Sequence, residues 1–134
     1  MKGLLKYSLL LFTLLLVLSC DERQIQPFEQ GFLEGKVTIG PLCPVEKFPP
    51  DPACEPTEDT YKAWPIVVWT ADKKTKIAKI QPELNGNYKI DLPEGSYIVA
   101  LDKKHRFGMN LPVPINIEPG KTLTLHIDID TGIR

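Results

Sequence analysis

The sequence predicts an all-β fold, an antiparallel β-sandwich of seven strands, and three observations carry this prediction. Turn signals recur roughly every eight to twelve residues from residue 31 onwards. Between the turns, apolar residues alternate with polar ones, which is typical of half-buried strands. Thirteen prolines disfavour long helices, and no segment after residue 20 has apolar residues at helical spacing. We therefore expect one β domain over residues 31–134.

The first strand is expected from residue 31 to 39. Leu33, Val37 and Ile39 share one face with Gly35, while the residues between them are mostly polar. The strand ends at the turn dipeptide Gly40-Pro41. Residues 41–60 contain six prolines, so we expect an irregular excursion there.

The second strand is expected over residues 63–70, where branched and aromatic side chains are dense. Pro65 lacks a ladder N–H, which places it near the start of the strand or on a free edge. A turn at residues 72–74 leads to a third strand over residues 76–81. Asn85-Gly86 then predicts a tight hairpin, because such a turn needs a positive φ angle.

Four further strands after that hairpin complete the predicted sandwich. The fourth carries Tyr88, Ile90 and Leu92 on one face, and the fifth carries Tyr97, Val99 and Leu101. The sixth carries Val113, Ile115 and Ile117, and the seventh carries Leu123, Leu125, Ile127 and Ile129. Turns at residues 93–95 and 119–120, both containing proline and glycine, separate them.

The first nineteen residues have the pattern of an export signal. Lys2 and Lys6 precede an apolar run from Tyr7 to Leu18, and the small residue Ser19 follows. The run is too short for a comfortable membrane span. We therefore predict a signal peptide over residues 1–19 that is removed on export.

Residues 17–20, Val-Leu-Ser-Cys, resemble the lipobox of bacterial lipoproteins. The resemblance implies that Cys20 is acylated, as with palmitate, becomes the mature N-terminus and anchors the protein to a membrane of the bacterial cell envelope. An ordinary secretory signal and an uncleaved anchor are the alternatives. Residues 20–30 are then a polar tether between the lipid and the domain.

The charge balance excludes one class of partner. The 115 residues from Cys20 to Arg134 suffice for one domain with a core. Without the two lysines of the signal, 14 basic residues stand against 17 acidic ones, a formal charge of −3. No basic stripe interrupts this balance, so we expect no binding to nucleic acid.

The remaining cysteines form an even pair. Once Cys20 is acylated, Cys43 and Cys54 are left in an oxidising compartment, where disulfides persist. We predict a disulfide between them, worth roughly 3 kcal/mol in the chain-entropy model for a loop of about a dozen residues. The alternative is a zinc site that combines both cysteines with His105 or His126, although the spacing lacks a Cys-x-x-Cys pair and a paired histidine motif.

Three passages resemble the carboxypeptidase regulatory-like domains, which are transthyretin-like β-sandwiches with immunoglobulin-like Greek-key connections. They are Gly35-Lys36-Val37-Thr38, Asn85-Gly86-Asn87-Tyr88 and Leu92-Pro93-Glu94-Gly95-Ser96-Tyr97. Within that group, residues 40–45, Cys54 and the ending Gly132-Ile133-Arg134 resemble a set of small exported bacterial proteins with a Gly-Ile-Arg tail. The resemblance covers about residues 31–129 and implies the fold, but it is silent on activity.

The catalytic motifs of related enzymes do not occur in this sequence. Neither His105 nor His126 has a partner at zinc-protease spacing, and the chain is too short for the catalytic domain of a zinc carboxypeptidase. The Tyr-Arg-Gly-Ser ending of a transthyretin-like hydrolase of the urate pathway is also missing. Ser96 is the only serine after the signal. We expect no enzyme and no cofactor, with a small envelope hydrolase as the weakest alternative.

Candidate binding residues fall in three places. Trp64 and Trp69 are five residues apart, so on one strand they point to opposite faces, one into the core and one towards a sugar or a partner. His126, Asp128 and Asp130 share one face of the last strand, either as a cation site or as the solvated side of an edge strand. Arg134, beside the terminal carboxylate, is expected to fold back onto an acidic residue or to meet a partner.

Together these patterns predict a lipid-anchored protein of the bacterial cell envelope that acts without catalysis as a binding or structural accessory. The expected partners are the membrane, through the lipid, and another envelope protein, through a sheet edge or residues 41–60. Binding of a polysaccharide or a cation is the alternative function.

Overall fold

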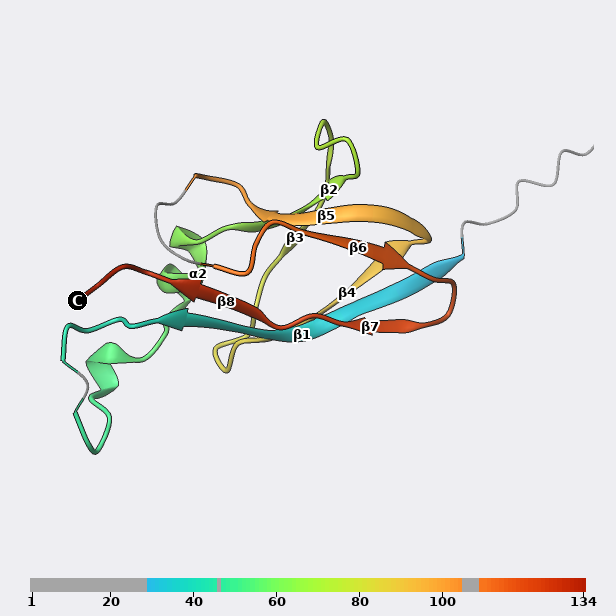
Figure 1. Cartoon of the computed structure of the whole chain (residues 1–134). Helices are drawn as coiled ribbons and strands as arrows, with labels where there is room; N and C mark the ends of the chain where they lie inside the picture. The colour runs from blue at the N-terminus through green and yellow to red at the C-terminus, as the bar shows by residue number, and fades with distance from the viewer. Residues whose placement is uncertain (1–28, 46, 105–108) are drawn as a thin grey trace, which may run out of the picture.

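The computed structural model describes residues 29–45, 47–104 and 109–134, which form two β-sheets packed face to face (Figure 1). The first sheet contains β1 (Gln30–Gly40), β4 (Asn87–Pro93), β7 (Thr122–Thr124) and β8 (Ile127–Asp130). The second contains β2 (Ile66–Thr70), β3 (Lys76–Ile80), β5 (Gly95–Leu101) and β6 (Val113–Ile117). The strand order is β4-β1-β7, with β8 also paired to β1, against β3-β2-β5-β6. The predicted β-sandwich is confirmed.

The core lies between the sheets and follows the predicted alternation. On β1, Leu33, Val37 and Ile39 are buried, while Lys36 and Thr38 between them are exposed. Every buried residue that the structure describes is apolar or aromatic. Each such side chain contributes about 1.5–3 kcal/mol when it leaves water. The other strands supply Ile66, Val68, Ile80, Tyr88, Leu92, Tyr97, Val99, Ile115, Ile117, Ile127 and Ile129 to the same cluster.

The last predicted strand differs from the expectation in two ways. It is divided into β7 and β8, and both pieces run parallel to β1, whereas β4 pairs with β1 in the antiparallel sense. The chain crosses from β6 in the second sheet to β7 in the first through the turn at residues 118–121, and so meets β1 from its free side. The expectation of a purely antiparallel sandwich is therefore wrong for this strand.

The division between β7 and β8 occurs where the backbone of Leu125 comes close to Gly35. A Cβ atom on Gly35 would lie 1.9 Å from the carbonyl oxygen of Leu125. That oxygen accepts a hydrogen bond of 2.6 Å from the hydroxyl of Tyr88. On the other side of the gap, Nδ1 of His126 accepts the backbone N–H of Lys36 at 3.2 Å. Side chains thus replace the ladder bonds that the interruption removes.

The Asn85-Gly86 turn has the predicted positive φ angle, +86° at Gly86, but it does not form a hairpin. β3 belongs to the second sheet and β4 to the first, so the turn carries the chain between the sheets. The carbonyl of Gly86 accepts the N–H of Val37 at 2.8 Å, and a Cβ atom on Gly86 would lie 2.4 Å from the oxygen of Val37. The glycine is needed for this close approach to β1 as well as for its φ angle.

A short helix that the sequence analysis did not predict precedes β2. The helix α2 (Glu58–Ala63) begins at Thr57, whose side chain and that of Thr60 form a reciprocal capping box. It occupies the end of the segment expected to be irregular, and β2 consequently starts at Ile66 instead of residue 63. Trp64 is the C-cap of α2, so it does not share a strand with Trp69.

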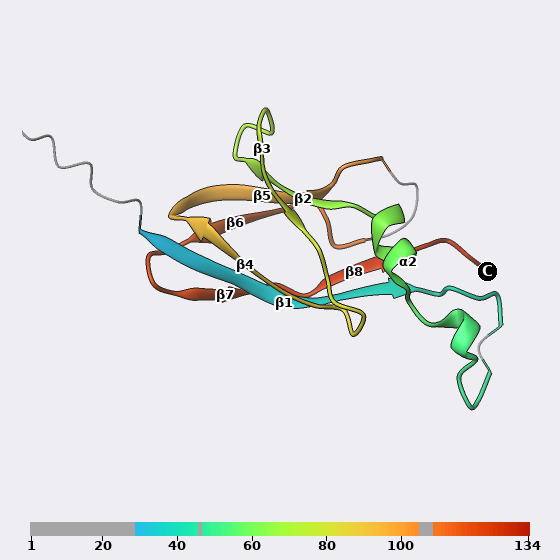
Figure 2. The same ribbon diagram turned by 180° about the vertical axis from the view of Figure 1, so that it is seen from behind.

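The two ends of the sandwich carry different parts of the chain (Figure 2). We call the end where β1 begins the near end and the end where β1 finishes the far end. At the near end, β1 begins beside the 118–121 turn, and the N–H of Gly120 donates to the carbonyl of Gln30 at 2.9 Å. At the far end, where β1 finishes at Gly40, lie α2, residues 41–45 and 47–57, and the C-terminus. Residues 1–28, which include the predicted signal peptide, Cys20 and most of the tether, lie outside the described residues. In the described ranges, no helix has the length and hydropathy needed to cross a membrane.

Candidate functional site

Residues 43–54, called the disulfide loop below, project from the far end of the sandwich. A disulfide joins Cys43 to Cys54, whose Cα atoms are 5.6 Å apart, and this confirms the predicted pair. Leu42, just before the loop, packs against the core. Inside the loop, the carboxylate of Asp51 accepts the N–H of Ala53 at 2.9 Å, at the start of a 3-10 turn (Pro52–Cys54). The loop is therefore closed covalently and has local order of its own.

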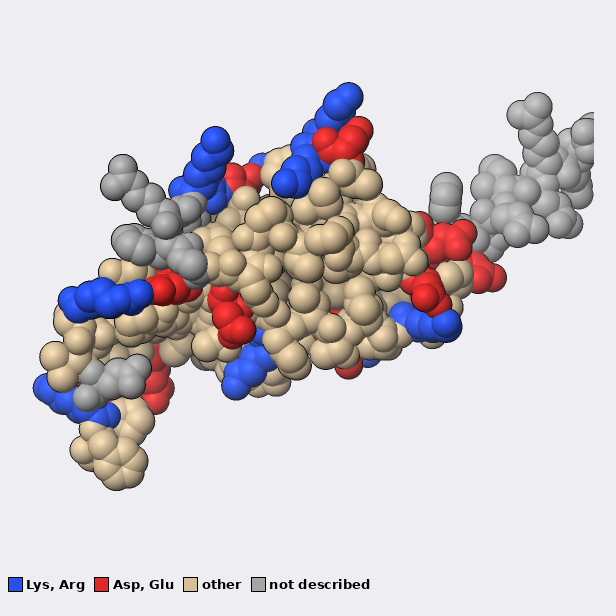
Figure 3. All heavy atoms as spheres, viewed as in Figure 1, with Lys and Arg blue, Asp and Glu red and all other residues tan. Residues whose placement is uncertain are grey.

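Two apolar side chains of the disulfide loop face solvent. Phe48 is 98% exposed and Val45 is 67% exposed. In Figure 3 the lowest part of the protrusion at the far end is tan, and charged side chains lie directly above it. Prolines at positions 44, 49 and 50 limit the conformations that this stretch can adopt in solution. The two exposed apolar side chains of this closed loop make its tip a candidate contact surface.

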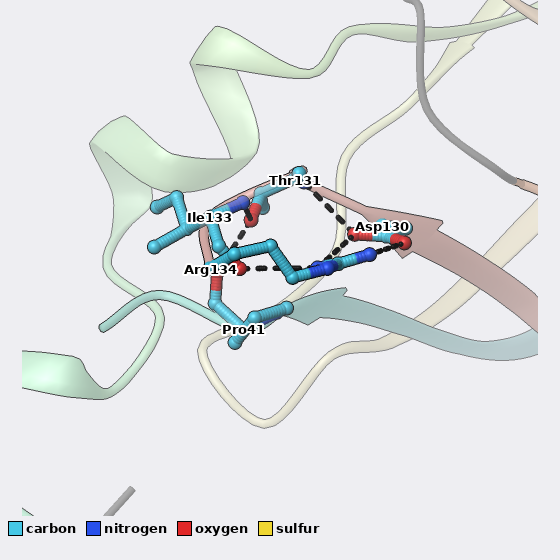
Figure 4. Close-up of polar contacts among 6 residues, drawn as sticks. Pro41, Asp130, Thr131, Ile133 and Arg134 are labelled. Atoms are coloured by element: carbon cyan, nitrogen blue, oxygen red, sulfur yellow. Dashed lines mark hydrogen bonds and ion pairs between the residues drawn. The ribbon is translucent and has the colours of Figure 1, made fainter. Parts of the chain in front are cut away.

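The last five residues, Asp130 to Arg134, form a hydrogen-bonded turn that we call the C-terminal clasp (Figure 4). The N–H of Thr131 donates to the carbonyl of Gly40 at 3.1 Å, and its hydroxyl donates to the carbonyl of Pro41. The N–H of Gly132, which has a φ angle of +77°, donates to the carboxylate of Asp130 at 2.8 Å. The clasp thus ties the end of the chain to the residues that lead into the disulfide loop.

Arg134 closes the clasp by folding back onto Asp130. Its guanidinium donates to both carboxylate oxygens of Asp130, at 2.7 and 3.2 Å, and to the carbonyl of Ile133 at 3.0 Å. These hydrogen bonds lower the pKa of Asp130 and raise that of Arg134. Pairing with an acidic residue is one of the two alternatives predicted for Arg134, and a docking role stays a prediction.

A hollow lies at the far end between α2 and the segment that leaves β3, with a cavity volume of about 280 Å³. Tyr61, Ile80, Pro82 and Leu84 provide its apolar lining. The hydroxyl of Tyr61 donates to the carbonyl of Leu84 at 3.4 Å, and burial raises the pKa of Tyr61. The charged residues that line the hollow are Glu58, Lys62, Lys79 and Glu83.

Neither tryptophan is fully exposed, so the expectation of one core and one exposed ring is not what the structure shows. Trp64 is half-buried and packs against the core cluster. Trp69, at the end of β2, is also half-buried, and the ammonium of Lys76 lies 5.2 Å from its ring centroid. Lys76 in turn pairs with Asp102 at 2.7 Å. One face of the Trp69 ring is therefore partly covered by Lys76, which belongs to the same sheet.

The predicted polar row on the last strand is split among different contacts. His126 binds the backbone of β1, Asp130 belongs to the clasp, and Asp128 is exposed. Asn110 lies along this edge, where its side chain accepts the N–H of Asp128 at 3.0 Å and donates to the carbonyl of His126 at 2.8 Å. The Asn110 amide thus occupies a backbone N–H and a backbone carbonyl at this edge of the sheet, so these groups are not free to pair with a strand of another chain.

Metal-binding residues do not gather in the parts of the chain that the structure describes, since no three His, Cys, Asp or Glu side chains there are placed to hold an ion. Cys43 and Cys54 are consumed by their disulfide, so the zinc alternative that used them is wrong. His105 lies outside the described residues.

Sequence reasoning named residues 41–60 as a docking segment but did not single out Phe48, Val45 or Leu84. Phe48 stands between a lysine and two prolines, which marks it as a loop residue in the sequence but does not show whether the fold buries it. Leu84 had a weaker signal, since it stands directly before the Asn85-Gly86 turn. The hollow combines α2 with a distant turn, so only the fold could reveal it.

No family model matches this chain, and no curated protein matches it. Its fold is similar to that of a DUF3823 family protein from Parabacteroides merdae, with 16% identity over 75% of this chain and 46% of that protein, and a TM-score of 0.47. A minor pilin of Streptococcus agalactiae, GBS52, has 14% identity over 77% and 45%, with a TM-score of 0.48. The TIE protein of Bacillus anthracis has 14% identity over 75% and 16%, with a TM-score of 0.45. The chain thus spans less than half of these solved proteins, and likenesses this distant assign neither family nor activity.

Proposed function

We propose that this chain is a lipid-anchored β-sandwich of the bacterial cell envelope that acts without catalysis as a binding accessory of another envelope protein. Acylation of Cys20 would supply the anchor, since two or more acyl chains suffice for stable membrane residence. The observation that carries the binding role is the disulfide loop, which presents Phe48 almost fully exposed at the far end of the domain.

The order of the loop favours binding over chance exposure. Closure by the Cys43–Cys54 bond and attachment of Pro41 to the clasp reduce the conformational freedom that the loop would lose on binding. Aromatic residues at the centre of an interface carry much of its binding energy. A preorganised loop with one bare phenylalanine therefore fits the insertion of that ring into a pocket of a protein partner.

The length of the chain before β1 favours a partner away from the anchoring membrane. Residues 21–29 can span at most about 30 Å when fully extended. β1 has 11 residues, and at about 3.3 Å per residue it is roughly 36 Å long. With the tether extended and the sandwich upright, the far end can therefore stand well away from the bilayer that holds Cys20. In that orientation the disulfide loop would be displayed to other envelope proteins.

Photo-crosslinking in intact host cells tests this function. A photoreactive amino acid replaces Phe48 in the full chain, and the crosslinked products are identified by mass spectrometry. We expect one reproducible envelope protein at this position and none when the same amino acid replaces Lys121 at the near end. Equal products from both positions, or products that contain only lipid, would contradict a docking role for the loop.

A further inference from the structure

The strand β4 forms the one long, regular sheet edge that is left open among the described residues. It has seven residues and pairs with β1 alone, without a shift in register. Each of the other sheet edges has a feature that hinders pairing with a further strand. β6 contains Pro114, the register of β3 shifts between Val68 and Trp69 of β2, β7 has three residues, and β8 is covered by the Asn110 amide. An extended chain can therefore be added to the fold most readily at β4.

The pattern of hydrogen bonds shows which backbone groups of β4 face this open edge. The N–H of Val37 donates to the carbonyl of Gly86 at 2.8 Å, just before β4 begins in register with β1. Because the direction of the backbone groups alternates along an antiparallel strand, the even-numbered residues of β4 face β1 and the odd-numbered residues face outwards. The N–H and carbonyl groups of Lys89 and Asp91 thus have no strand opposite them in the described part of the chain.

Both ends of this open edge are closed by the protein itself. The carbonyl of Asn87 accepts the N–H of Glu83 at 2.8 Å, and the N–H of Asn87 donates to the side chain of Asn85 at 2.8 Å. Pro93 has no N–H, and its carbonyl accepts the hydroxyl of Tyr97 at 2.8 Å. The edge that remains, residues 88–92, is therefore symmetric about its centre, with one outward-facing residue on each side.

We propose that two copies of this chain pair through β4, with the two strands antiparallel and a two-fold axis at Ile90. Lys89 of each copy then lies opposite Asp91 of the other. Because both residues direct their backbone groups outwards, each of the two pairs exchanges two backbone hydrogen bonds. The contact joins the two β1-containing sheets into one continuous sheet, and it needs none of the backbone groups that are already bonded at residues 87 and 93.

The side chains of Lys89 and Asp91 favour this register over the alternatives. Both are exposed on the outer face of the sheet, and opposite charges directly across a strand pair are favourable. An axis one residue to either side places Lys89 against Lys89 or Asp91 against Asp91, and a parallel pair does both. Asp91 makes no ion pair with the residues that the structure describes. Lys89 already lies 3.4 Å from the carboxylate of Glu34 and 5.1 Å from the ring centroid of Phe32, so in the pair its ammonium stands between two carboxylates.

The two sandwiches overlap only in their near halves, because β4 lies beside residues 30–36 of β1. The far ends therefore project in opposite directions, and both disulfide loops stay free. The two chains enter β1 about 20 Å apart along the strand direction, at about 3.3 Å per residue. Both tethers, each about 30 Å long when extended, can thus reach one bilayer when the pair lies along it. The contact goes beyond the proposed function and does not depend on it, since it uses a different surface.

Cysteine crosslinking between two differently tagged copies of the full chain tests the register. One copy carries Lys89→Cys and the other Asp91→Cys, so a mixed pair brings the two cysteines to a Cα separation of about 5.5 Å and keeps the second lysine–aspartate pair intact. After coexpression in host cells and mild oxidation, we expect a covalent dimer on a non-reducing gel and a linkage of position 89 to position 91 by mass spectrometry. Either variant expressed alone is the matched control and should give at least tenfold less dimer, because equal positions lie diagonally and too far apart for a disulfide. Equal yields from mixed and single expression would overturn the proposal.

Charge reversal provides a second measurement, which adds no cysteine. Sedimentation of the full chain in detergent should show a dimer that Asp91→Lys weakens at least tenfold, since this change places lysine against lysine. The double variant Lys89→Asp with Asp91→Lys restores opposite charges and should recover the dimer. Asp128→Lys, on an exposed residue of β8 at the other edge of the sheet, should leave the dimer unchanged.

Two results of the sedimentation measurement would overturn the proposal. One is a monomer at all concentrations, and the other is a dimer that the reversal at position 91 does not weaken. The crosslinks at Phe48 that test the proposed function are independent of both results, because the disulfide loop lies at the far end and β4 pairs with the near half of β1. Failure of the pair and failure of the proposed function can therefore be told apart.

Discussion

The hydroxyl of Tyr88 donates a hydrogen bond of 2.6 Å to the carbonyl oxygen of Leu125, and this bond joins β4 to the gap between β7 and β8. Leu125 is also held from the other direction, since its N–H donates to the carbonyl of Glu34 at 2.8 Å. The two bonds hold the backbone in place at the gap between β7 and β8. The motif residues Gly35 and Tyr88 thus act on the same carbonyl group.

Tyr88→Phe removes the donor and leaves the carbonyl of Leu125 without this partner. We expect the free energy of unfolding to fall by about 1–3 kcal/mol, the usual penalty for a buried group that loses its hydrogen bond. Urea denaturation of the full chain measures the change. Tyr61→Phe is the matched control, because its bond to the carbonyl of Leu84 is longer, at 3.4 Å. Equal losses in the two variants would contradict the role given to the Tyr88 bond.

The same tyrosine predicts how stability depends on alkaline pH. Burial raises the pKa of Tyr88 from 10.0 to about 12, so the folded state holds the phenolic proton more tightly than the unfolded state does. The stabilisation is complete below pH 10 and is lost as the pH rises towards about 12. We expect Tyr88→Phe to reduce this loss over that pH range. Parallel slopes for the two proteins in thermal melts from pH 9 to 12 would argue against it.

Gly35→Ala places a methyl group against the backbone of Leu125. The new Cβ atom would lie 1.9 Å from the carbonyl oxygen, so the strand pieces must move apart. We expect a loss of about 1–3 kcal/mol, as for other overpacked positions. Gly40→Ala is the control at the end of the same strand, because its Cβ would meet no atom within 4 Å. Denaturation curves that shift equally for both alanines would show that loss of glycine itself, and not the contact, is responsible.

Much of this architecture could be predicted because it depends on neighbours in sequence. Alternation predicted β1, β4, β5 and β6, and the glycine of Asn85-Gly86 predicted a positive φ angle. The sheet that each strand joins depends on distant partners, so the sequence predicts a hairpin at residues 85–86 that does not form, and it does not predict that β7 and β8 run parallel to β1. The sequence analysis did not predict α2, because its six residues are too few to show an apolar period. The two capping residues, Thr57 and Thr60, could nevertheless be recognised in the sequence.

The candidate site was less predictable than the fold. The Cys43–Cys54 pair followed from counting, and the spacing of four residues between Asp130 and Arg134 suits an ion pair. The exposure of Phe48 could not be inferred, because an apolar residue in a loop can equally well cover the core, as Leu42 does. Whether a loop residue is covered depends on how the whole domain closes around it.

The C-terminal clasp predicts that the last residues stabilise the fold. Deleting Gly132 to Arg134 removes the partner of Asp130 and the turn that positions Thr131 against Pro41. We expect a lower melting temperature for the full chain. Lys62→Gln serves as the control, since the ion pairs of Lys62 with Glu58 and Asp59 are exposed. An unchanged melting curve after the deletion would exclude a structural role for the tail.

A subtler change tests the ion pair itself. The hydrogen bonds from Arg134 hold the pKa of Asp130 below its ordinary value, so the stabilisation is present above that ordinary value and is lost as the pH falls through the lowered pKa. Arg134→Gln should raise the pKa of Asp130, as followed by NMR titration of its side-chain carboxyl carbon. Asp128, which is exposed on the same strand, is the internal reference. A titration curve of Asp130 that does not move would show that the pair is not formed in solution.

Anchoring through Cys20 is tested by Cys20→Ser in the native host. Without the thiol no acyl chain can be attached, so the variant should leave the membrane fraction and lack the acyl mass in mass spectrometry. Ser19→Ala is the matched control, because it keeps a small residue before the cysteine and should leave both lipid and sedimentation unchanged. Retention of Cys20→Ser in the membrane would favour an uncleaved anchor, and its secretion without any change in mass beyond the substitution would favour an ordinary signal. In either case the disulfide loop and the hollow would remain intact, because the described β-sandwich begins at the near end of β1 and makes the far-end contacts independently of the lipid.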